Sequence, residues 1–186
     1  MVVFSLLLSL PTLFALTDVV APTMADGRMV LDPLSATATQ GETFTVTLKA
    51  QIPTAGNLIR ARVEYDSAIY LVSSTSIASS ISTWSTGSGF TTTTPGVITF
   101  YKQAGVGQTS VNGEFTIGTI TFLANAGAAE GEHSITLSPD IVTTDGDTAD
   151  NFIGVGTTNR ITSVTSSAIN IIAATNNPPV LNPIGA

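Results

Sequence analysis

The chain has 186 residues, with six Lys and Arg, thirteen Asp and Glu, and a net charge of −7. A thinly spread negative charge with no basic cluster argues against nucleic acid and anionic lipid as partners. The absence of Cys excludes disulfides, thiolate metal sites and a cysteine nucleophile. Charged residues are only 10% of the chain, against about 25% in a typical soluble domain. Thr, Ser, Gly and Ala replace them, which suits an extracellular protein.

Residues 1–25 contain an apolar run from Val2 to Leu16, followed by Thr23-Met24-Ala25. This pattern is typical of an export signal with its cleavage point, and it predicts an extracellular or cell-surface location. A membrane anchor and a buried core helix are the alternatives. Membrane contact is expected only through this segment, if it is not cleaved. The roughly 160 residues that remain are enough for one domain with one core.

The folded part is expected to begin at residue 26, with a short strand at residues 28–32. Residues 43–51 then place apolar side chains on every even position, which is the period of a half-buried strand. Residues 58–66 alternate in the same way, and Arg60, Arg62 and Glu64 form the outer face. Residues 53–57 are predicted to turn the chain between these two strands.

Further strands are predicted at residues 69–72, 97–102, 114–124 and 133–137, with one or two more at 161–172. The Ser- and Thr-rich stretch from 73 to 94 is expected to be irregular. Within 114–124 the apolar positions change from odd to even near Gly118, which predicts a β-bulge there. No window shows helical periodicity. The pattern therefore predicts an all-β, two-sheet sandwich of about nine strands over residues 26–172.

Residues 173–186 are rich in Pro and Asn, with tandem Pro178-Pro179. This composition predicts an extended linker, and it looks like the start of a following Ig-like repeat.

An acidic loop contains Asp140, Asp145, Asp147 and Asp150, which are candidate oxygen ligands for Ca²⁺. The spacing differs from that of an EF-hand, and a solvated Asp-Gly turn is the competing interpretation. No other cofactor is expected.

Catalysis is not expected. His133 is the only His, so a metal cluster built on several His is impossible. The carboxylates of Glu130 and Glu132 lie in a Gly-rich loop with nothing to hold them at the spacing of a glycosidase pair. The sequence therefore predicts a binding protein and not an enzyme.

Three aromatic residues, Tyr70, Trp84 and Tyr101, offer a possible platform for stacking a sugar ring. Such a platform would make the chain a carbohydrate-binding module with a polysaccharide ligand. The competing interpretation places these rings in the core.

The order of elements resembles that of the cohesin domain family. The residues that carry the resemblance are Gly41 to Val46, Val63-Glu64-Tyr65-Asp66 with Leu71, Gly96 to Phe100, and Gly113-Glu114-Phe115 leading to Ile120-Thr121-Phe122. Many cohesins have Pro after the Tyr-Asp pair, where this chain has Ser67. The resemblance implies a jelly-roll sandwich in a secreted or surface multidomain protein. It also implies that one sheet face binds a dockerin-like module. A passive structural spacer in a surface protein is a rival interpretation.

The resemblance places the strand from Leu58 to Glu64 in the family's partner-binding sheet. The expected partner-binding residues are therefore Leu58, Arg60, Arg62, Glu64 and Tyr101. Two Arg on one exposed face are suited to bidentate bonds with partner carboxylates. A solvated face whose charges discourage edge pairing is the alternative.

Overall fold

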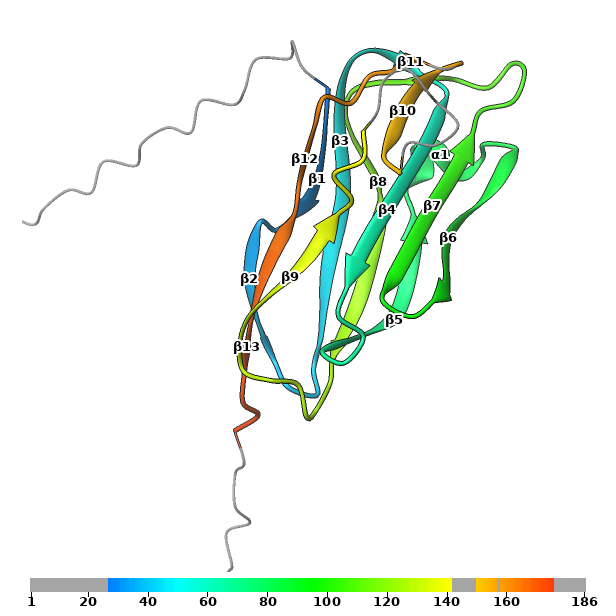
Figure 1. The fold of residues 1–186 in the computed structure, drawn as a ribbon. Helices are drawn as coiled ribbons and strands as arrows, with labels where there is room; N and C mark the ends of the chain where they lie inside the picture. The colour runs from blue at the N-terminus through cyan, green and yellow to red at the C-terminus, as the bar shows by residue number, and fades with distance from the viewer. Residues whose placement is uncertain (1–26, 142–149, 157, 176–186) are drawn as a thin grey trace, which may run out of the picture.

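The computed structural model describes residues 27–141, 150–156 and 158–175. Two β-sheets pack face to face (Figure 1). The first sheet contains, in spatial order, β12 (Ser163–Thr165), β1 (Arg28–Asp32), β3 (Thr43–Gly56), β8 (Val111–Ala124) and β5 (Tyr70–Ile77). The predicted two-sheet sandwich is confirmed.

The second sheet is built around β4, which pairs with two strands in succession along one edge and with a third strand along the other. Its path is β11 (Thr158–Asn159), β10 (Phe152–Val155), β4 (Leu58–Tyr65), β9 (Gly131–Leu137), β13 (Ser167–Ile172) and β2 (Ser35–Thr39). Along the other edge of β4 lies β7 (Val97–Gln103), and β6 (Thr86–Thr94) pairs with β7. A four-residue helix, α1 (Ser79–Ser82), lies between β5 and β6.

The terminal strands pair in parallel, although most neighbours are antiparallel. In the first sheet β1 runs parallel to β12, and in the second β2 runs parallel to β13. Pro33, between β1 and β2, interrupts the chain where it passes from one sheet to the other. Both ends of the domain are therefore held by backbone pairing with each other.

The core lies between the sheets and is filled by the inward-facing residues of both. Phe122 of β8 is fully buried, and three aromatic rings surround it. Its ring centroid is 5.7 Å from that of Phe44, 5.9 Å from that of Tyr70 and 5.4 Å from that of Tyr65. The predicted even-position pattern of β3 is confirmed, because Val46, Leu48 and Ala50 face this core.

Burial raises the pKa of the Tyr70 phenol from 10.0 to about 12, and the negative charge of Asp66 adds to the effect. The folded state therefore favours the neutral phenol. Its contribution to stability is complete below pH 10 and is lost as the pH rises towards 12. We expect the unfolding free energy to fall across this window by more in the wild type than in Tyr70→Phe, measured by urea denaturation. Equal declines in both proteins would contradict this expectation.

The bulge predicted near Gly118 is confirmed. Leu48 pairs with Gly118 but Lys49 pairs with Thr116, so Ile117 is the extra residue on β8. Gly118 is also a point of close approach, because a Cβ there would lie 2.3 Å from the carbonyl oxygen of Ser76 and 2.6 Å from the Phe90 ring. The missing side chain thus lets Phe90 of β6 pack against β8.

Several boundaries differ from the prediction. The described residues contain thirteen strands where about nine were expected, because the terminal edges are divided into short pieces. The turn expected at residues 53–57 is part of β3, which continues to Gly56 through a register irregularity. Short strands β10 and β11 were missed, since two to four residues are too few to show alternation. Among the described residues no helix is long and apolar enough to span a bilayer.

Candidate protein-binding face

The outer face of β4 and β7 brings together all five residues predicted to bind a partner. Leu58, Arg60, Arg62 and Glu64 alternate along β4, on the face away from the core. Tyr101 of β7 lies directly opposite Arg60 in the antiparallel ladder. We refer to these five residues as the β4–β7 face.

Leu58 belongs to this face but is covered, because it is only 8% exposed. It packs against Phe152 of β10, which is fully buried, and Tyr101 lies partly buried against both. Leu58 was expected to point outward as a contact residue. The structure instead makes Leu58 and Phe152 an apolar support beneath the ring of Tyr101.

Tyr101 is held in place by two groups besides this support. The guanidinium carbon of Arg60 lies 5.7 Å from the ring centroid, which is a cation–π arrangement. The phenol donates a hydrogen bond to Oε1 of Gln103 at 3.0 Å. An aromatic ring fixed in this way loses little conformational entropy when it contacts a partner.

Arg62 is already paired with carboxylates of its own chain. Its Nε lies 2.8 Å from Oε1 of Glu64, and its Nη1 lies 3.8 Å from Oδ1 of Asp150. The three side chains are between 31% and 44% exposed, so solvent weakens these attractions. A partner carboxylate would have to compete with two intramolecular ones at Arg62, which makes this residue a weaker anion site than the sequence suggests.

A buried amide that the sequence analysis missed supports this arrangement. Asn151 is fully buried, its Oδ1 accepts the backbone N–H of Arg62 at 3.0 Å, and its Nδ2 donates to the carbonyl of Ser138. The Ser138 hydroxyl in turn donates to Oδ2 of Asp150 at 2.7 Å. Asn151 therefore ties the segment before β10 to β4 and places Asp150 beside Arg62. The sequence feature that could have indicated its burial is its position directly before an apolar pair, Phe152-Ile153.

The predicted calcium ligands are only partly within the described residues. Asp140 and Asp150 are described, whereas Asp145 and Asp147 lie outside the described residues. Asp150 already accepts from Ser138 and lies beside Arg62. In the described part of the chain no three His, Cys, Asp or Glu side chains are grouped to hold a metal. The calcium site remains a prediction.

The aromatic platform for a sugar is wrong. Trp84 is only 3% exposed, and its indole N–H donates to the carbonyl of Thr109 at 3.1 Å. Tyr70 is fully buried in the core. The Ser- and Thr-rich sequence around Trp84 suggested an exposed loop, but the ring fills the end of the core near α1. The competing core interpretation is correct for both rings.

A family model for the cohesin domain matches residues 29–171. The chain belongs to the cohesin family. Solved cohesins resemble it in fold despite low sequence identity. A solution structure of a cohesin from Clostridium acetobutylicum has a TM-score of 0.63 at 16% identity, covering 78% of this chain and 90% of that one. No curated protein matches the chain.

Two further solved cohesins show how widely this fold is shared. The seventh ScaB type I cohesin from Pseudobacteroides cellulosolvens has a TM-score of 0.62 at 15% identity, covering 83% of this chain and 97% of that one. A non-cellulosomal cohesin from the archaeon Archaeoglobus fulgidus has a TM-score of 0.59 at 14% identity, covering 80% and 92%. Cohesins are a family of non-catalytic binding domains.

Proposed function

We propose that this cohesin is a docking receptor that binds a dockerin-type protein module through the β4–β7 face. The observation that carries the proposal is the fixed ring of Tyr101, stacked with Arg60 and supported by buried Leu58 and Phe152. A rigid aromatic beside an Arg is the composition found at the energetic centre of protein interfaces. A similar fold, the sixth cohesin of scaffoldin B from Acetivibrio cellulolyticus, was solved in complex with a Cel5 dockerin.

The charges of the face favour recognition by shape and apolar contact over steering by net charge. The positive charges of Arg60 and Arg62 equal in number the negative charges of Glu64 and Asp150, so the face presents little net charge to a partner. Contact energy is then concentrated at Tyr101 and Arg60, with Thr99 and Thr91 beside them as hydroxyl-bearing neighbours.

We infer that the module acts outside the cell, exported by residues 1–25, in a longer chain of surface domains.

Replacing Tyr101 by Ala is expected to weaken dockerin binding by about 30-fold or more, which corresponds to about 2 kcal/mol at an interface centre. The substitution removes the ring that stacks with Arg60 but no group of the main core. Binding would be measured by isothermal titration calorimetry of the full chain against the dockerin modules encoded in the same genome.

Thr119→Ala is the matched control, because Thr119 lies on the outer side of β8 in the other sheet. It should leave dockerin affinity unchanged. Loss of binding in Thr119→Ala with normal binding in Tyr101→Ala would move the site to the other sheet. Failure of every dockerin to bind would refute the docking role, and retention on insoluble polysaccharide in a parallel assay would favour the carbohydrate alternative.

A further inference from the structure

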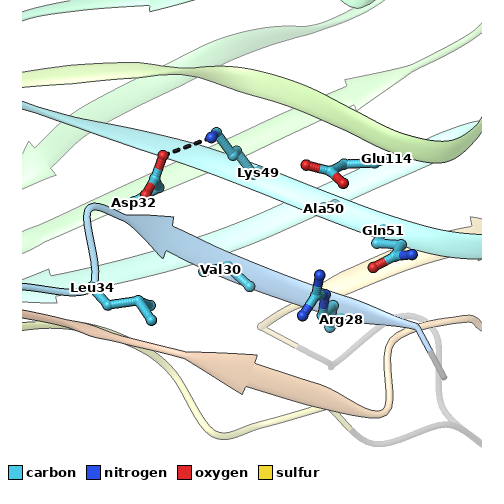
Figure 2. Close-up of a pocket in the computed structure, with 8 residues that line it drawn as sticks. All are labelled: Arg28, Val30, Asp32, Leu34, Lys49, Ala50, Gln51 and Glu114. Atoms are coloured by element: carbon cyan, nitrogen blue, oxygen red, sulfur yellow. Dashed lines mark ion pairs between the residues drawn. The ribbon is translucent and has the colours of Figure 1, made fainter. Parts of the chain in front are cut away.

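A depression of about 190 Å³ lies on the outer face of the first sheet, away from the β4–β7 face (Figure 2). Strands β1, β3 and β8 line it. Arg28 pairs with Gln51 in the ladder, and Gln51 pairs with Glu114. These three side chains thus form one row across three strands, with Gln51 in the middle.

Gln51 forms the floor of this depression and is only 9% exposed. Its side-chain amide makes no hydrogen bond with any described residue. The amide atoms themselves reach solvent, because among the described residues only Nε of Arg160 is a fully buried side-chain polar atom without a hydrogen-bond partner. An amide that bonds only to water at the bottom of an open depression is available to a ligand with its own donor and acceptor.

Full charges of opposite sign flank this amide. Within the described part of the chain, neither the Arg28 guanidinium nor the Glu114 carboxylate forms a salt bridge or a side-chain hydrogen bond. At the other end of the depression, Nζ of Lys49 lies 2.6 Å from Oδ2 of Asp32. The dashed line in Figure 2 marks this salt bridge. The pKa of Lys49 is raised by its hydrogen bond to Asp32 and also by the charge of Glu114, so Lys49 is a neighbour of opposite charge for Glu114. The two charges without a salt-bridge partner among the described residues, Arg28 and Glu114, flank Gln51.

The remaining wall is aliphatic. Val30 of β1 lies between the row of Arg28 and the Lys49–Asp32 pair, and Leu34 is 55% exposed at the rim. A short apolar side chain of a ligand could rest along this wall. The depression thus combines a donor, an acceptor and an amide at one end with apolar surface beside them.

We propose that this depression binds a free α-amino acid with an aliphatic side chain. The ligand's carboxylate pairs with Arg28, its ammonium group pairs with Glu114, and its apolar side chain lies over Val30 towards Leu34. Strand spacing of about 4.8 Å on each side of Gln51 places the two charged residues close enough to reach one small zwitterion. A neutral polyol would leave both charges without a counter-charge, so it fits less well. The inference does not depend on dockerin binding.

The test is a titration of the full ¹⁵N-labelled chain with L-leucine, followed by heteronuclear NMR. Saturable shifts are expected at residues of β1, β3 and β8 around Gln51. N-acetyl-leucine lacks the ammonium charge and leucinamide lacks the carboxylate, so each is expected to bind at least about 10-fold more weakly. Glycine, which lacks the aliphatic side chain, should bind several-fold more weakly.

Two variants complete the test. Glu114→Gln alters an exposed side chain, and Gln51→Leu keeps the side-chain size without the unpartnered amide, so both should fold and bind L-leucine at least about 10-fold more weakly. Glu130→Gln, in the loop between β8 and β9, is the matched control and should bind normally. The proposal is overturned if L-leucine causes no saturable shifts up to about 50 mM, if N-acetyl-leucine binds equally well, or if Glu114→Gln binds as the wild type does.

Discussion

Phe122→Ala is expected to lower the unfolding free energy by about 3–5 kcal/mol, a large part of the stability of a domain of this size. Phe122 is fully buried and contacts the rings of Phe44, Tyr65 and Tyr70 from three sides. Removing it would leave a cavity that the surrounding strands of two sheets cannot close. Urea denaturation followed by circular dichroism would measure the loss.

Phe115→Ala on the same strand provides the control. Phe115 is only partly buried at the edge of the core, so its truncation should cost clearly less than that of Phe122. Similar losses for both variants would show that the cluster around Phe122 is not the centre of the core. A Phe122→Leu variant should recover part of the loss, because it refills part of the cavity.

Asn151→Ala is expected to cost about 2–5 kcal/mol, although it removes only a small polar side chain. The change leaves the backbone N–H of Arg62 and the carbonyl of Ser138 without their partners, in a place from which water is excluded. Each orphaned group costs about 1–3 kcal/mol. The same denaturation experiment would measure it. Dockerin affinity should fall as well, because Asn151 anchors the chain next to Phe152 beneath Tyr101.

The matched control is Asn125→Ala, whose amide donates to the carbonyl of Ala68 at 2.7 Å in a more exposed turn. Water can replace this bond, so the expected loss is below about 1 kcal/mol. If Asn125→Ala lowered the unfolding free energy as much as Asn151→Ala does, the burial of the hydrogen bonds of Asn151 would not explain the effect of Asn151→Ala.

The architecture could be predicted wherever a strand was long enough to show alternation. The even-position pattern of β3 identified its core face, and the change of phase near Gly118 identified the bulge. Short strands could not be found in this way. The strand β10 has four residues, and the side-chain carbonyl of Asn159 accepts the N–H groups of Ile153 and Ile161 and so replaces part of the sheet pairing.

The sequence could predict which residues share the outer face of the candidate site, but it could not predict which of them are exposed and which are already paired. Alternation placed Arg60, Arg62 and Glu64 on one outer face, and the structure agrees. It could not show that Leu58 is covered by Phe152, because these residues are almost a hundred positions apart in the chain. Nor could it show that Asp150 lies beside Arg62. Composition could not decide between an exposed Trp84 and a core Trp84, whose indole N–H donates to the carbonyl of Thr109.

The parallel pairing of the terminal strands determines how the domain would respond to mechanical load. Arg28 pairs with Ser163 and Thr39 with Ile172, so the first residue of β1 and the last residue of β13 lie at opposite ends of the paired segments (Figure 1). Tension applied at these two points would slide the strands past each other instead of peeling them apart. Many hydrogen bonds would then have to break together, and the rate of forced unfolding would be correspondingly low.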